Sequence, residues 1–98
     1  MIVVADTSPI NYLIQIEQVS VLSRLYGRVL IPRGVFQELT HPVAPPEVRD
    51  WAASRPVWLE ILTPQTSLRL PRLDPGESEA IALALESNAD FLLIDDAL

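Results

Sequence analysis

The stretch Ile2-Val3-Val4-Ala5-Asp6-Thr7-Ser8-Pro9 decides the fold of this chain. Its first four residues are small or β-branched and apolar, without polar alternation, which is typical of a strand buried on both faces of a parallel sheet. Asp6 follows at the carboxyl end of this strand, and the next three residues resemble a helix start. Because open α/β sheets bind ligands beyond the carboxyl ends of their strands, Asp6 is a candidate functional residue.

Length and composition limit the classes of protein to which the chain can belong. We interpret residues 1–98 as one small domain with a folded core, because 49% of the residues are hydrophobic. The net charge of −6 disfavours a simple nucleic-acid-binding module, but it is compatible with an enzyme whose acids hold a divalent metal. The chain has no cysteine, and all seven basic residues are arginine, so thiolate chemistry, a P-loop and a Schiff-base lysine are excluded.

The sequence also bears on where the protein works. No apolar run approaches the roughly 18 residues that a membrane span needs. The chain enters its first strand without a preceding basic segment, so we expect no signal peptide. These observations predict a cytoplasmic protein that does not bind a membrane.

Strands and helices are expected to alternate along the chain. Apolar runs predict strands at residues 2–5, 28–31, 57–62 and 91–94. Helical periodicity and helix-start residues predict two helices between the first two strands, helices at about 32–39 and 47–54, and one at about 74–87. This order predicts an α/β fold, with a small parallel sheet between helix layers in a three-layer α/β/α arrangement.

Four acidic positions are expected to converge at one edge of this sheet. Asp6 and the pair Asp95-Asp96 end the two most apolar strands, Glu38 lies late in the third helix, and Glu77 lies in the first turn of the helix before the last strand. Close carboxylates repel one another unless they are protonated or neutralised by a cation, and Mg²⁺ or Mn²⁺ is the natural partner of an oxygen-only cluster. Such a site can activate water and stabilise a phosphodiester transition state.

The residues at the start of the chain and Glu38 also have simpler interpretations. Asp6 could be an ordinary helix-start residue, and Glu38 could be a solvated side chain beside an apolar stripe. Ser8 is expected to cap the first helix, with Pro9 as its first residue. Thr7 and Ser8 could instead bind a metal-bound water or a phosphate, and Asn11 could point into the same crevice.

The choice of the third and fourth acids stays open. Asp74 and Glu77 have the spacing of a capping box, so Glu77 could serve only the helix N-terminus. Glu77 also shares a face with residues expected to meet the sheet, which places it ahead of Glu79. Asp96 is preferred to Asp95 because it is farther from the strand.

Taken together, four segments of the chain resemble a PIN domain, specifically the VapC-like, DUF3368-type branch. They are residues 3–9, 31–39, 73–84 and 92–96. Each is weak alone, but all four in this order are specific, and the resemblance covers essentially the whole chain.

The resemblance implies a metal-dependent endoribonuclease that cleaves single-stranded RNA at a four-acid site. Carried over to this chain, the acids are Asp6, Glu38, Glu77 and Asp96, with Glu79 and Asp95 as competitors for the last two. The resemblance further implies the toxin of a toxin–antitoxin pair, acting as a homodimer and inhibited by an antitoxin protein that covers the site.

The chain departs from similar proteins at its end. They continue beyond the Asp-Asp motif with a helix and a short fifth strand, whereas this sequence ends at Leu98, so we expect the final strand to be missing and the domain to be incomplete at its C-terminus. A catalytically inactive PIN-like module, acting by dimerisation or antitoxin binding, is therefore the main alternative. A metal-dependent phosphatase on a similar sheet is a third.

Overall fold

The computed structural model describes residues 1–66 and 72–94 of the chain. In this part of the chain, helices and strands follow the order expected from the sequence. They are β1 (Ile2–Ala5), α1 (Thr7–Gln15), α2 (Val21–Tyr26), β2 (Arg28–Pro32), α3 (Arg33–Leu39), α4 (Pro46–Ser54), β3 (Leu59–Leu62), α5 (Pro75–Ser87) and β4 (Phe91–Leu93).

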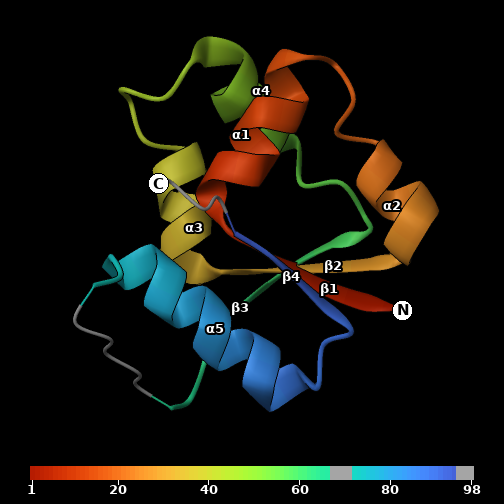
Figure 1. Cartoon of the computed structure of the whole chain (residues 1–98). Coiled ribbons are helices and arrows are strands. Elements are labelled where there is room, and N and C mark those ends of the chain that lie inside the picture. The colour runs from red at the N-terminus through yellow and green to blue at the C-terminus, as the bar shows by residue number, and fades with distance from the viewer. Residues whose placement is uncertain (67–71, 95–98) are drawn as a thin grey trace.

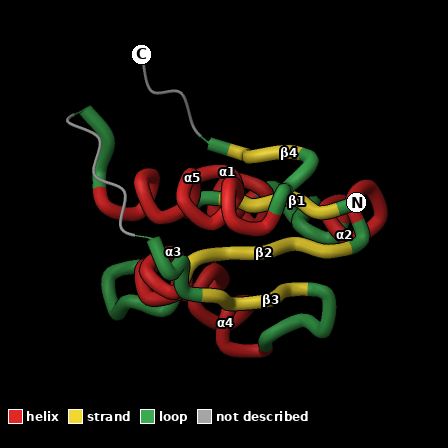
Figure 2. The backbone as a smooth tube through the Cα atoms, turned by 90° about the horizontal axis from the view of Figure 1, so that it is seen from below, coloured by secondary structure: helices red, strands yellow, loops and turns green. Residues whose placement is uncertain are grey.

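The described strands form one sheet in the order β3-β2-β1-β4, and all neighbouring pairs are parallel. β1 lies inside this sheet, where Val3 is paired with Val29 of β2 on one side and Phe91 of β4 on the other. Figure 2 shows the strands side by side in this order. The central position explains why β1 is apolar along its whole length: helices cover both faces of the strand.

The two faces of the sheet carry different helices (Figure 1). Val3 and Ala5 point to the face covered by α1, α2, α3 and α4, and this side holds the larger core. Val4 and Leu30 point to the opposite face, where they pack against Ala80 and other residues of α5. The predicted α/β fold with a three-layer α/β/α arrangement is therefore confirmed for the described residues.

Two element starts differ from the prediction by two residues, and several other boundaries differ by one. α1 begins at Thr7 with Asp6 in the N-cap position, so the prediction that Ser8 caps this helix is wrong. β3 begins at Leu59 and not at Val57, because the Leu59 N–H donates to the carbonyl of Pro56 and closes a turn that leaves Val57 98% exposed. None of the described helices has the length and apolar character needed to cross a membrane.

Candidate functional site

Asp6 is held where β1 gives way to α1. Its backbone N–H donates to the carbonyl oxygen of Leu93 at 3.0 Å, which extends the pairing of β1 with β4 by one residue. The residue is only 7% exposed, and its side chain makes no capping hydrogen bond to α1. The helix-start interpretation therefore does not account for the carboxylate, which lies buried at the carboxyl edge of the sheet.

A glycine at the start of α5 marks the point where carboxylates from three parts of the chain converge. A Cβ atom built on Gly76 would lie 3.0 Å from Glu38 Oε1, 3.4 Å from Asp74 Oδ1 and 3.5 Å from Asp6 Oδ1. We call this group of three oxygens around Gly76 the carboxylate cradle. The structure thus brings together Asp6 and Glu38, which are far apart in the sequence.

Glu38 reaches the cradle from the last turn of α3. Its neighbours Val35 and Leu39 are buried in the larger core, which fixes the orientation of this short helix. Glu38 itself is exposed, so its carboxylate lies at the solvent side of the cradle. Within the cradle, Asp6 is therefore the buried carboxylate and Glu38 the solvent-exposed one.

Asp74 supplies the third oxygen and also begins α5. Its Oδ1 accepts a hydrogen bond of 2.7 Å from the N–H of Glu77. This is the hydrogen bond that an N-cap residue makes in a capping box, and the spacing of Asp74 and Glu77 predicted it. From the sequence alone, Asp74 was expected only to cap the helix. The sequence feature that could have indicated its second position, beside Gly76, is the run Asp74-Pro75-Gly76 at the helix start. In this run an acid is followed closely by a residue without a side chain.

The other predicted acids are placed differently. Glu77 is half-buried in the first turn of α5, at the edge of the sheet-facing stripe of this helix, which includes Gly76 and Ala80. The Glu79 carboxylate lies over the first turn of α3, where its Oε1 would be 2.6 Å from a Cβ on Gly34. Asp95 and Asp96 lie outside the described residues.

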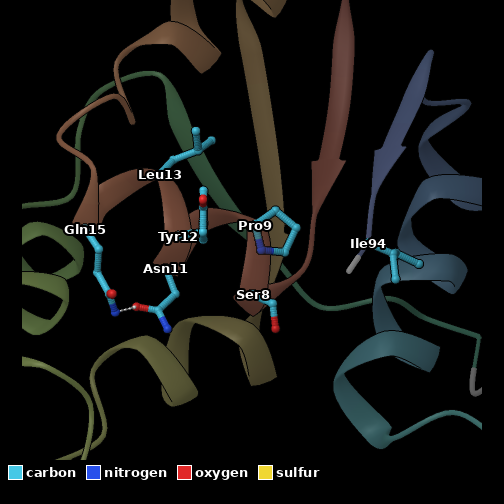
Figure 3. Close-up of a pocket in the computed structure, with 7 residues that line it drawn as sticks. All are labelled: Ser8, Pro9, Asn11, Tyr12, Leu13, Gln15 and Ile94. Atoms are coloured by element: carbon cyan, nitrogen blue, oxygen red, sulfur yellow. Dashed lines mark hydrogen bonds between the residues drawn. The ribbon is translucent and has the colours of Figure 1, made fainter. Parts of the chain in front are cut away.

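Three polar residues predicted near Asp6 lie on two sides of α1. Thr7 Oγ1 is buried and has no hydrogen-bond partner among the described residues. Ser8 is exposed and lines a cavity of about 630 Å³ together with Asn11 and Ile94 (Figure 3). Thr7 and Asn11 also line a groove of about 330 Å³ that includes Glu38.

The donor set of the cradle suits a hard divalent cation. Its atoms are all carboxylate oxygens, which are preferred by Mg²⁺ and Mn²⁺, and the space at Gly76 is kept open by the absence of a Cβ. Among residues 1–66 and 72–94, however, no three acidic or histidine side chains are arranged so that they could already hold a metal ion. The side chains of Asp6, Glu38 and Asp74, whose oxygens lie around Gly76, would have to move closer together to hold a cation at this point.

The fold and these acids define the class of the protein. It is an α/β protein with a parallel sheet and a group of acidic side chains near the carboxyl ends of its strands. A comparison with protein families matches residues 2–98 to DUF3368, which is described as a PIN domain. The chain therefore belongs to this PIN-domain family, and membership indicates a nuclease-type function. No curated protein and no solved structure matches the chain at the significance required in these two comparisons.

Proposed function

We propose that the protein is a metal-dependent endoribonuclease that cleaves single-stranded RNA. The observation that supports this most strongly is the convergence of Asp6 and Glu38 oxygens on Gly76 in a chain that belongs to the PIN-domain family. PIN domains are generally nucleases and typically use divalent metals. The proposed acids are Asp6, Glu38, Glu77 and Asp96, with Asp74 as an additional candidate beside Gly76.

The described residues have distinct tasks in this proposal. Buried Asp6 provides a carboxyl group in a fixed position, since the β1–β4 backbone hydrogen bond to Leu93 restrains the residue. Exposed Glu38 binds from the solvent side, where a polymer can approach. A bound Mg²⁺ or Mn²⁺ would supply activation of water and stabilisation of the charge that develops on the phosphodiester.

Net charge supports the need for a cation. The chain carries a formal charge of −6, so an RNA backbone is repelled by the protein as a whole. A divalent ion among the carboxylates reverses the sign of the local field and makes phosphate binding favourable. RNA cleavage should therefore depend strictly on the added ion.

The test is cleavage of a single-stranded RNA in the presence of Mn²⁺ by wild type, Asp6→Asn and Glu38→Gln. Two exposed acids on α4 give matched controls, Asp50→Asn and Glu47→Gln. We expect both cradle variants to lose most of the activity and both α4 variants to retain it. Equal activity of Asp6→Asn and wild type would refute the proposal.

The cellular role that we propose is the toxin of a toxin–antitoxin pair, active as a cytoplasmic homodimer and inhibited by an antitoxin protein. The resemblance of the four sequence segments to VapC-like proteins supports this role. Tyr12 of α1 and Ile16, which follows the last residue of this helix, are large exposed side chains suited to a protein contact. Light scattering of the purified protein tests the dimer, and a small reading frame beside the gene would support an antitoxin.

A catalytically inactive PIN-like module is the second candidate function. It is favoured by one observation: the described residues contain no group of three potential ligands arranged to hold a metal. Calorimetric titration with Mn²⁺ separates the two candidates. Binding in the micromolar range supports the enzyme, whereas no heat of binding supports the inactive module.

A further inference from the structure

A groove lies directly beside the carboxylate cradle. It has a volume of about 330 Å³ and is formed by α1, the end of α3, the α3–α4 connection and the start of α4. Glu38 belongs to both the groove and the cradle, and the groove residue Thr7 follows Asp6 in the chain. A ligand that reaches the cradle therefore has a neighbouring space at the small end of the size range of ligand pockets, about 300–1,000 Å³.

The polar residues that line this groove are Thr7, Asn11, Glu38 and His41, and two of them, Asn11 and His41, each keep a hydrogen-bond donor available. Asn11 Oδ1 accepts a 3.0 Å hydrogen bond from Gln15 Nε2, so the Asn11 amino group is left to donate (Figure 3). His41 Nδ1 accepts from the N–H of Val43 at 3.1 Å, which places the hydrogen of the neutral ring on Nε2.

The hydroxyl of Thr7 adds an unsatisfied group to the same groove. Its Oγ1 is buried without a hydrogen-bond partner among the described residues. Buried polar atoms in native proteins nearly always have a partner, and the Thr7 hydroxyl is the buried side-chain oxygen among the described groove residues that lacks one.

The other residues that line the groove are apolar. They are the aliphatic residues Leu39, Val43, Ala44, Pro45 and Val48. Val43 is 85% exposed, so this part of the apolar lining is accessible from solvent. A lining that combines apolar side chains with the donors of Asn11 and His41 suits a flat ring that carries acceptors on its edge.

We infer that this groove holds one unstacked nucleobase of the RNA, next to the phosphodiester at the cradle; the inference rests on the proposed nuclease function. Proteins recognise single-stranded RNA by packing splayed bases against side chains and by hydrogen bonding their edges. The donors of Asn11 and His41 favour bases with ring carbonyl oxygens, such as uracil. Uracil presents two carbonyl oxygens to these donors, whereas adenine presents ring nitrogens beside its own amino donor and should fit less well.

The test compares labelled RNA hexamers of uridine, of adenosine and of abasic ribose, measured by fluorescence anisotropy in Ca²⁺. We expect wild type to bind hexauridylate about threefold to tenfold more tightly than the other two, the effect of about one neutral hydrogen bond. Thr7→Val and Asn11→Ala should each remove most of this preference and leave the affinity for the abasic hexamer unchanged. Thr63→Val, an exposed isosteric change outside the groove, is the matched control.

Loss of folding does not explain the expected result. Thr7→Val removes a buried hydroxyl without a described partner, so this variant should melt at or above the wild-type temperature. Equal affinity of wild type for all three hexamers would overturn the inference. Unchanged RNA affinity in both groove variants would also overturn it and would assign the groove to another ligand, such as a partner peptide.

The experiment separates this inference from the proposed function. A wild type that cleaves RNA in Mn²⁺ but shows no base preference refutes the nucleobase subsite alone. A wild type that neither binds nor cleaves any of the hexamers refutes the nuclease and the subsite together.

Discussion

Replacing Gly76 with alanine should separate cation binding from folding. In the native structure the new methyl group would lie 3.0 Å from Glu38 Oε1 and within 3.5 Å of oxygens of Asp74 and Asp6. Only the first distance is tight, and the Glu38 side chain is exposed and can move by a few tenths of an ångström. The methyl group would nevertheless occupy the place where the three carboxylates meet.

The two free-energy effects of this substitution have opposite signs. Alanine is favoured over glycine by up to about 1 kcal/mol in a helix, so the unfolding free energy without metal should stay the same or rise by up to that amount. The displacement of one carboxylate should weaken Mn²⁺ binding by at least about tenfold, or ~1.4 kcal/mol. A more stable protein that binds metal more weakly is not expected from a general structural defect.

Urea unfolding with and without Mn²⁺ measures both effects in one experiment. At a concentration 100 times the wild-type dissociation constant, the ion should stabilise wild type by about 2.7 kcal/mol and the variant by about 1.4 kcal/mol. Gly34→Ala serves as the comparison, because its methyl group would displace Glu79 and not the cradle acids. Equal stabilisation of wild type and Gly76→Ala by Mn²⁺ would refute the assignment of the cradle as a cation site.

Three further predictions concern the supports of the site and the acid response of the fold. Asp74→Ala should lower the free energy of unfolding in urea by about 1 kcal/mol, because Asp74 caps α5. Asp74→Asn should lower it little, because the asparagine side chain can also accept the hydrogen bond of the Glu77 N–H. Equal losses in the two variants would contradict the capping role. Leu30→Ala should lower the free energy of unfolding by about 2–5 kcal/mol, because this 1% exposed side chain fills the core between the sheet and α5. A decrease of less than about 1 kcal/mol would be inconsistent with this packing. Backbone N–H groups of Gln65 and Thr66 lower the pKa of Glu86 below that of the unfolded chain, so its stabilisation is present above pH 4.5 and is lost as the pH falls through the folded pKa. Urea midpoints of wild type and Glu86→Ala should therefore differ at pH 7 and converge at acidic pH, and an equal difference at both would contradict the assignment.

Much of the fold is predictable because the local and the tertiary signals agree. β1 lacks polar alternation and is covered on both faces, and the residues of α3 that repeat with helical spacing, Val35 and Leu39, are those in the core. The Asp74 cap and the left-handed Asn88 at the end of α5 also follow from residue type alone. At these positions short-range preferences and long-range packing require the same structure.

The errors arose where two local signals compete. Ser8-Pro9 has the sequence of a helix start, but the parallel pairing of β1 with β4 continues to Asp6, and the helix begins directly after it. Val57 belongs to an apolar run, but Pro56 accepts the hydrogen bond of a turn that delays β3 until Leu59. The start of α1 is therefore set by a hydrogen bond between strands, and the start of β3 by a hydrogen bond within a turn. Neither hydrogen bond can be recognised from residue composition alone.

The arrangement of the acids shows what linear spacing does not contain. α3 and α5 approach each other with reciprocal contacts, in which Glu38 lies over Gly76 and Glu79 lies over Gly34. A glycine on each helix provides the room for a glutamate of the other helix. These glycines were not predicted as part of the site, because a residue without a side chain does not contribute to a pattern of apolar or charged positions. Glu38 thereby comes close to Asp6 beside Gly76, whereas Glu79 lies over the start of α3.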